Sequence, residues 1–433
     1  MNKQEVYEKH KKYLVPCVAT YYKEPLVIDR GKGKVVYDLE GKEYLDFFGG
    51  ILTISVGHCD DEVTSKTIDQ MRKLQHTSTL YPTVPIVALA EKLAQVTPGR
   101  LQKSFFTNSG TEAIETAILL AQLYTKSHEF IVLRHCYSGA SLLTMNITAH
   151  QHYRLTESLV PGVKHAHNAY CYRCAFGLEY PSCDLQCAKD MKELIETTTS
   201  GHPAALLAEP IQGVGGFVTP PKEYFKEVVS TVRKCGGVFI CDEVQTGWGR
   251  TGDRMFGIEH WGVEPEVMVM AKGAANGAPV GITIATPEVG DALKGGHIST
   301  FGGNPVVATA VLATLDVIEK RKLPQNAKKM GDYLRSGLDE MKEKYPIIGE
   351  VRGMGLIQGM EIVKDRKSKQ PAPDHVAELF EETKKRGLLI GKGGLYNNVI
   401  RLTPPMIIER ADIDHAVGVL HDAFDAVSAA HKG

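Results

Sequence analysis

The sequence predicts an α/β protein, with a large domain built on a mostly parallel sheet and a smaller α+β domain after it. Between residues 85 and 285, short apolar segments rich in β-branched residues alternate with segments of helical periodicity. This alternation is typical of a sheet covered by helices on both faces. After about residue 320 the pattern changes. The chain of 433 residues is also longer than a single hydrophobic core usually supports, so we expect two domains.

The individual elements follow from local patterns along the chain. Strand-like segments at residues 35–38 and 44–48 flank Glu40-Gly41-Lys42, a turn typical of a hairpin. In the large domain we expect helices at residues 84–95 and 113–124, and strands at residues 105–107, 129–133, 204–208, 237–241, 267–270 and 281–285. The last four strands are short and apolar, as buried parallel strands are. In the smaller domain we expect helices at residues 327–344 and 376–386, and strands at residues 347–352, 356–363, 388–390 and 400–402.

We divide the chain accordingly into three parts. Residues 1–60 form an N-terminal segment that packs with the small domain, residues 61–320 form the large domain, and residues 321–433 form the small one. Residues 160–190 are rich in Cys, His and Tyr and are predicted to be an irregular insertion. In open sheets of this kind, ligands gather just past the carboxyl ends of the strands.

Composition excludes several classes of partner. With 50 Lys+Arg and 51 Asp+Glu the net charge is −1, so neither a nucleic acid nor an anionic membrane is expected as a partner. The first twelve residues are polar and no apolar signal region follows them, and no apolar run is long enough to span a bilayer. The nine cysteines sit in a chain large enough to build its own core, which favours free thiols and a cytoplasmic location.

The first candidate for chemistry is the run of residues 106–113, where small residues join a strand to a helix. The free backbone N–H groups and the positive end of the helix dipole favour a phosphate there. The alternative is that Ser109 or Thr111 is an ordinary helix N-cap.

Two further candidates follow buried strands directly. Asp242 ends the strand at residues 237–241, where its carboxylate could keep a pyridine nitrogen protonated, cap a helix or bind a metal. Lys272 follows the strand at residues 267–270, and a desolvated lysine with a lowered pKa attacks aldehydes. A phosphate cradle, a strand-end Asp and a strand-end Lys together are what pyridoxal 5′-phosphate (PLP) requires.

At this point the chain resembles the class III, or ω-amino acid type, aminotransferases of PLP fold type I. The resemblance runs from about residue 44 to residue 405. It is carried by four motifs in order: Ala208-Glu209-Pro210-Ile211-Gln212-Gly213, Asp242-Glu243-Val244-Gln245-Thr246-Gly247, Ala271-Lys272-Gly273 and Thr300-Phe301-Gly302-Gly303-Asn304-Pro305.

The resemblance implies a role for each matching residue. Lys272 carries the cofactor as a Schiff base and moves the proton, and Asp242 pairs with the pyridinium nitrogen. Gln245 contacts the ring hydroxyl, Tyr137 stacks on the ring, and the phosphate is held by Ser109, Gly110 and Thr111. Thr300 reaches the cofactor phosphate of a neighbouring subunit, which implies a homodimer with shared active sites, with a tetramer left open. The family usually has Tyr-His-Gly where this chain has Tyr137-Ser138-Gly139, so the polar role of that His is in doubt.

Arg401 matches the family's substrate-carboxylate arginine. Members that use ornithine, acetylornithine or 4-aminobutyrate usually have Glu after the Pro-Ile-Gln-Gly run, to neutralise this arginine, whereas this chain has Val214. With the runs at residues 44–51 and 55–59, Val214 indicates a similarity to the mitochondrial-type alanine–glyoxylate aminotransferases and their bacterial relatives. The implied substrates are small: alanine, β-alanine or a related ω-amino acid as donor, and glyoxylate or pyruvate as acceptor.

Several alternatives remain open. The same scaffold hosts 4-aminobutyrate or ornithine aminotransferases, phospho-lyases and decarboxylases, and a non-enzymatic PLP-fold regulator is a further alternative that the intact Lys272, Asp242 and Gln245 disfavour. Cysteines 171, 174, 183 and 187 have spacings that can hold zinc, but the central spacing is short for a zinc ribbon. We therefore predict no metal, with packed thiols in a surface insertion.

Overall fold

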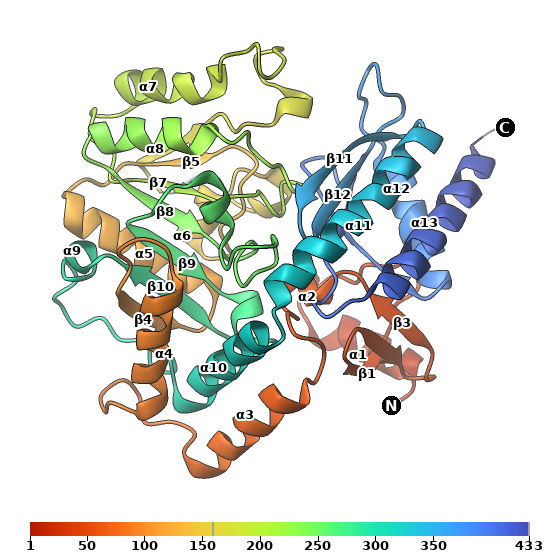
Figure 1. Cartoon of the computed structure of the whole chain (residues 1–433), viewed down its shortest axis with the longest axis horizontal. Helices are drawn as coiled ribbons and strands as arrows, with labels where there is room; N and C mark the ends of the chain where they lie inside the picture. The colour runs from red at the N-terminus through yellow and green to blue at the C-terminus, as the bar shows by residue number, and fades with distance from the viewer. Residues whose placement is uncertain (158–159, 432–433) are drawn as a thin grey trace.

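The computed structural model describes residues 1–157 and 160–431. Its centre is a seven-stranded sheet in the order β4-β10-β9-β8-β7-β5-β6, with helices on both faces (Figure 1). The strands are β4 (Lys103–Thr107), β5 (Phe130–Leu133), β6 (Val163–Ala166), β7 (Ala205–Ala208), β8 (Val238–Asp242), β9 (Val267–Met270) and β10 (Gly281–Ala285). Strands β6, β5, β7, β8 and β9 run parallel, so the α/β fold with a mostly parallel sheet is confirmed.

Strand β10 departs from the prediction. Residues 281–285 were expected to be a parallel strand, but β10 pairs antiparallel with both β9 and β4. A parallel return needs a crossover of about a dozen residues or more, usually a helix. Residues 271–280 offer only the short turn η4 (Lys272–Ala275) and a loop, so the chain folds straight back beside β9.

Residues 160–190 are also more ordered than predicted. Strand β6 occupies residues 163–166 and extends the central sheet at its edge, beside β5. The single turn η2 (Cys171–Arg173) follows, and α7 (Gln186–Thr198) begins before the segment ends. Residues 160–162, 167–170 and 174–185 lack helix and strand, so the prediction of an irregular insertion is right for these parts.

The helices of the large sheet are α3 (Asp61–Lys73), α4 (Val84–Val96), α5 (Gly110–Thr125), α6 (Leu142–Ile147), α7, α8 (Tyr224–Lys234), α9 (Pro287–Gly290) and α10 (Pro305–Lys320), with short turns at η1 (Gln151–Tyr153) and η3 (Gly257–Trp261). Strands β8 and β9 are buried over their whole length. Burial of each large apolar side chain contributes roughly 1.5–3 kcal/mol, so these strands form a rigid base for whatever follows them.

The C-terminal part has its own sheet, in the order β11-β12-β15-β14. Its strands are β11 (Ile348–Met354), β12 (Ile357–Ile362), β14 (Gly391–Gly393) and β15 (Val399–Leu402), and its helices are α11 (Leu323–Lys344), α12 (Pro373–Lys385) and α13 (Arg410–Ala430). Figure 1 shows these elements, coloured from cyan to blue, beside the large sheet.

The N-terminal part begins with α1 (Lys3–Tyr13) and continues with β1 (Ile28–Lys32), β2 (Val35–Asp38), β3 (Glu43–Asp46) and the short α2 (Gly49–Leu52). Strands β2 and β3 form the predicted hairpin. Strand β13 (Leu388–Leu389) pairs parallel with β3, so the N-terminal segment shares a sheet with the C-terminal part. The division of the chain at residues 60 and 320 remains a prediction. In the described part of the chain, no helix is both long and apolar enough to cross a membrane.

Candidate functional site

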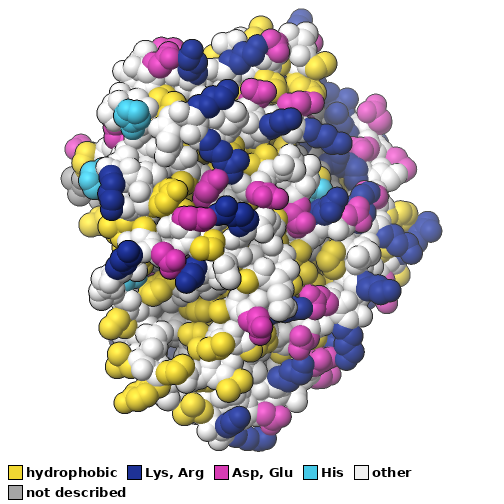
Figure 2. Space-filling model, turned by 60° about the vertical axis from the view of Figure 1, so that its left-hand side comes forward, with side chains coloured by type: hydrophobic (Ala, Val, Ile, Leu, Met, Phe, Trp, Pro, Cys, Tyr) yellow, Lys and Arg dark blue, Asp and Glu magenta, His cyan; other side chains and the backbone are white. Residues whose placement is uncertain are grey.

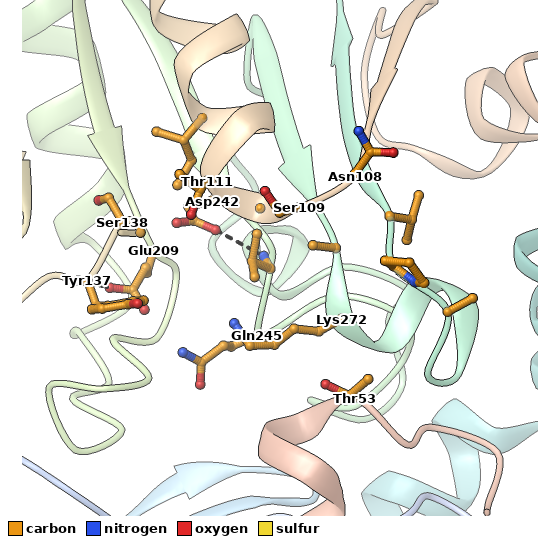
Figure 3. Close-up of a pocket in the computed structure, with 18 of the residues that line it drawn as sticks. Thr53, Asn108, Ser109, Thr111, Tyr137, Ser138, Glu209, Asp242, Gln245 and Lys272 are labelled. Atoms are coloured by element: carbon orange, nitrogen blue, oxygen red, sulfur yellow. Dashed lines mark hydrogen bonds between the residues drawn. The ribbon is translucent and has the colours of Figure 1, made fainter. Parts of the chain in front are cut away.

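A cavity of about 310 Å³ lies where β8 and β9 end and α5 begins. Its walls contain Ser109, Gly110, Thr111, Tyr137, Asp242, Gln245 and Lys272, seven of the residues selected from the sequence. Figure 3 shows Lys272 extending into this space with Asp242 and Gln245 near it and Tyr137 on the far side. The structure therefore brings together residues that lie up to 163 positions apart in the chain, from Ser109 to Lys272.

The start of α5 forms one wall. Ser109 is the N-cap, and its hydroxyl accepts a hydrogen bond from the Glu112 N–H at 3.3 Å. The amide groups of the first turn thus meet the cavity at the positive end of a 16-residue helix. The N-cap at Ser109 is compatible with the predicted phosphate site, because a capped helix start still presents free backbone N–H groups.

Asp242 and Lys272, an acid and a base, lie at the ends of neighbouring strands. The Asp242 side chain is 4% exposed, and its Oδ1 accepts a hydrogen bond from the Val244 N–H at 3.0 Å. Burial raises the pKa of Asp242 to about 6, while Val244 and Lys272 oppose the rise. Burial also lowers the pKa of Lys272, against the attraction of Asp242 and Glu209. A lysine whose neutral amine is favoured in this way is suited to attack an aldehyde.

The backbone of Lys272 is strained. Its φ is 43°, in the left-handed region that residues with a side chain rarely adopt. Such strain persists where the surroundings fix it, and it is concentrated at functional sites. The turn that begins at Lys272 directs the side chain into the cavity rather than onward along the sheet.

Gln245 has a polar atom that the protein leaves without a partner. Its buried Oε1 makes no hydrogen bond to the described residues, which is unusual for a buried amide. A Cβ built on Gly213 would lie 2.2 Å from Gln245 Cδ, so residue 213 must be glycine for the amide to occupy this place. An unpaired oxygen, a helix start, a buried carboxylate and a half-buried amine in one cavity fit a phosphorylated pyridine aldehyde.

Glu209 is a wall residue to which sequence reasoning gave no role. It follows β7 directly, so the reasoning that selected Asp242 at the end of β8 could have found it. Its carboxylate accepts hydrogen bonds from the Tyr137 N–H at 3.2 Å and the Gly213 N–H at 2.8 Å. Burial, followed by the charge of Asp242, raises the pKa of Glu209 to about 8. Glu209 thus ties the Tyr137 loop and the Gly213 turn to the floor of the cavity.

Two sequence-selected residues lie outside this cavity. Thr300 lines a second cavity, of about 600 Å³, together with Asn108, Glu112 and Phe301. Arg401 comes from β15 and reaches the Gly213 turn, where its Nη1 donates to the Gly213 carbonyl at 3.3 Å. Its charge also acts on Lys272 and lowers the pKa of that amine further.

The four cysteines considered as zinc ligands all line one small cavity. All nine cysteines are free thiols. Within residues 1–157 and 160–431, no three His, Cys, Asp or Glu side chains are placed to hold a metal ion together.

The fold and this cavity define a class of PLP-binding proteins, and comparisons with known proteins identify the family. The model of the aminotransferase class-III family matches residues 18–424, so the chain belongs to the class III aminotransferases, which depend on PLP.

Among curated relatives, a mitochondrial alanine–glyoxylate aminotransferase 2 homolog from Arabidopsis thaliana is 42% identical over 95% of this chain and 85% of its own. A leucine/methionine racemase from Thermococcus litoralis is 35% identical over 100% of this chain and 98% of its own. Among solved structures, an (S)-enantioselective ω-transaminase from Thermomicrobium roseum is 32% identical, covers 99% of both chains and has a TM-score of 0.91.

Proposed function

We propose that this aminotransferase moves the amino group of alanine, β-alanine or a related ω-amino acid to glyoxylate or pyruvate. The observation that carries the proposal is the half-buried Lys272, which follows β9 and faces Asp242 in a cavity that also reaches the start of α5. The Arabidopsis relative, named for alanine and glyoxylate, supports this choice of substrates.

PLP, when bound, withdraws electrons from the substrate's amine-bearing carbon and so allows its proton to leave. In the proposed assignment, Lys272 would hold the cofactor through its amine and would supply the base that moves the proton of the substrate carbon. Asp242 would face the ring nitrogen and favour its protonated form. The unpaired Gln245 Oε1 serves the ring hydroxyl, Tyr137 covers the ring, and Ser109, Gly110 and Thr111 hold the phosphate.

Arg401 binds the substrate carboxylate in this assignment. A planar guanidinium donates two parallel hydrogen bonds to a carboxylate, which fixes the orientation of a small amino acid. The residue after Gly213 is Val214, which cannot neutralise Arg401. This favours donors and acceptors that keep a carboxylate on Arg401.

We also propose a homodimer in which Thr300 serves the partner's cofactor phosphate. Thr300 does not line the cavity of Lys272, and the neighbouring Ile298 and Phe301 are 61% and 58% exposed. Further exposed apolar residues precede or begin α4, namely Leu80, Tyr81 and Val84. Figure 2 shows apolar side chains gathered over the lower part of one face, where a second copy could cover them.

A half-reaction panel on the purified holoenzyme tests the proposed reaction. L-Alanine, β-alanine, 4-aminobutyrate, ornithine and phosphoethanolamine are added separately without acceptor, and the cofactor's visible absorbance band is followed. The proposal expects loss of the band with alanine or β-alanine and its recovery with pyruvate or glyoxylate. Three outcomes would contradict the proposed reaction. They are a reaction with phosphoethanolamine only, with release of phosphate; release of carbon dioxide; and racemisation without amino transfer.

A cytoplasmic location is part of the proposal. The nine free thiols support a reducing compartment, although the name of the Arabidopsis relative places that protein in mitochondria. Cell fractionation with detection of this chain decides between the two compartments.

A further inference from the structure

Arg401 is a buried cation whose protein partners are neutral. The side chain is 3% exposed, its Nε donates to the Lys392 carbonyl at 2.9 Å, and its Nη1 donates to the Gly213 carbonyl at 3.3 Å. None of the ion pairs among the described residues includes Arg401. A guanidinium in this state gains most from an anion that supplies two oxygens.

Two tyrosines stand around this cation. The ring of Tyr21 packs on Phe48 at a centroid distance of 5.9 Å, and Phe48 in turn lies 5.1 Å from the Arg401 guanidinium carbon. Arg401 donates toward the Tyr21 hydroxyl, and the hydroxyls of both Tyr21 and Tyr153 act on its charge. The two rings are 42% and 44% exposed, so each is only partly covered by the protein.

Tyr153 connects this group to the cofactor cavity. Its ring meets that of Tyr137 edge-on at 5.0 Å, and Tyr137 lines the cavity that contains Lys272. Tyr153 also packs against His150 at 5.1 Å. Tyr153 therefore packs on a side chain of the cavity wall.

The N-terminal segment holds Tyr21 in place against α12. The rings of Tyr21 and Phe380 meet edge-on at 5.8 Å, and the Lys23 N–H donates to Glu381 at 2.8 Å. Lys384 donates to the Glu24 carbonyl at 3.2 Å. Tyr21 is thus fixed by its neighbours rather than left as a free surface side chain.

The residue after Gly213 is Val214, so no acidic side chain at this position neutralises Arg401. Val214 has an apolar, buried side chain and contributes only its carbonyl, which accepts from the Gly394 N–H at 2.8 Å. Burial raises the pKa of Tyr21 above its usual value, so its hydroxyl stays neutral at physiological pH. Neutral hydroxyls donate hydrogen bonds to an anion without cancelling the charge of Arg401.

We propose that Tyr21 and Tyr153 complete the carboxylate subsite around Arg401 and determine which substrates this aminotransferase accepts. The inference rests on the proposed function, because it names the chemistry of substrates at that same site. The subsite stays cationic in both halves of the reaction, so donor and acceptor both carry a carboxylate close to the reacting carbon. Amines without one leave Arg401 buried and unpaired, and they bind poorly.

The test compares two donors that differ only in the carboxylate. Single-turnover loss of the cofactor band is measured in the holoenzyme with ethylamine and with the fastest carboxylate-bearing donor of the panel, expected to be L-alanine. The variants are Tyr21→Phe, Tyr153→Phe and the control Tyr22→Phe, because Tyr22 packs on Phe380 and Lys384 instead. Each of the first two variants is expected to raise the half-saturating concentration of alanine about tenfold, the value of one hydrogen bond to a charged group.

In both variants, the limiting rate with alanine and the reaction with ethylamine should equal those of the wild type. The Tyr22→Phe enzyme should match the wild type with both donors. The inference is overturned if neither variant raises the half-saturating concentration of alanine, or if that of ethylamine rises by the same factor. It is also overturned if the wild-type enzyme reacts with ethylamine as readily as with alanine. In those cases the proposed amino transfer still stands, because alanine reacts. If no carboxylate-bearing donor reacts with the wild type, the proposed function and the inference both fall.

Discussion

At the scale of single residues, Gly213 shows how closely the cavity is built around Gln245. A Cβ at residue 213 would meet the Gln245 amide at 2.2 Å, so Gly213→Ala must displace this side chain. We expect PLP affinity to fall about tenfold, the value of one lost hydrogen bond in a buried site. Fluorescence titration of the apoenzyme with PLP measures this, with Gly418→Ala as the control.

Gly418 suits as the control because a Cβ there meets nothing within 4 Å and the position lies on the exposed side of α13. Gly418→Ala should leave PLP affinity unchanged and stabilise the protein by roughly 0.5–1 kcal/mol, since alanine loses less freedom in a helix. Equal PLP affinity in Gly213→Ala and the wild type would contradict the proposal that Gln245 contacts the cofactor.

Glu209 is expected to make the stability of the apoenzyme depend on pH. Its pKa rises to about 8 through burial, from an unfolded value near 4.5, so the folded state holds a proton that the unfolded state has lost. The unfolded state then binds fewer protons between these values, and stability falls as pH rises from about 4.5 to about 8. Urea unfolding measures the free energy of unfolding at pH 5.5 and at pH 8. Between these pH values it should fall less in Glu209→Gln than in the wild type. An equal fall in both proteins would contradict the buried, protonated Glu209.

Sequence reasoning selected residues of the cavity wall where a charged side chain follows an apolar strand. Asp242 and Lys272 could be selected because β8 and β9 are apolar throughout and end abruptly at a charge. Glu209 follows β7 in the same way, but sequence reasoning used it only as part of the motif from Ala208 to Gly213 and gave it no role of its own. The roles of Tyr21 and Tyr153 could not be predicted, because both depend on contacts across the fold with Phe48 and Tyr137.

At the scale of elements, the start of α5 is expected to serve as the phosphate site. Ser109→Ala removes the N-cap bond to Glu112, which costs about 1 kcal/mol of helix stability and loosens the first turn. We expect weaker binding of PLP and unchanged binding of pyridoxal, which lacks the phosphate. Parallel titrations of the apoenzyme with both compounds measure this. A loss of the same size for both compounds would argue against a phosphate at this helix.

Element type was easier to predict than strand direction. Residues 281–285 are as apolar as the parallel strands, and the difference lies in the short connection before them, which forces an antiparallel return. Strand β6 was missed because residues 163–166 contain Lys164 and His165, and an edge strand needs less apolar character than a central one.

At the scale of the whole molecule, Thr300 tests whether two chains share one site. Lys272→Ala and Thr300→Ala chains are unfolded together and refolded to form mixed dimers. In half of the mixed sites Lys272 then meets an intact Thr300 from the other chain, so PLP affinity and turnover should recover in that half. The control mixes the Thr300→Ala chain with the double variant, which restores no site. Equal activity in both mixtures would show that Thr300 serves its own chain or neither.

The most direct measurement of the central claim locates the lysine that bonds the cofactor. The holoenzyme is reduced with borohydride, digested and analysed by mass spectrometry. The peptide that contains Lys272 should carry the added mass of the reduced cofactor, and Lys272→Ala should show none at any lysine. A cofactor mass on a different lysine, or its absence from every peptide of an active wild-type enzyme, would contradict the assignment of Lys272.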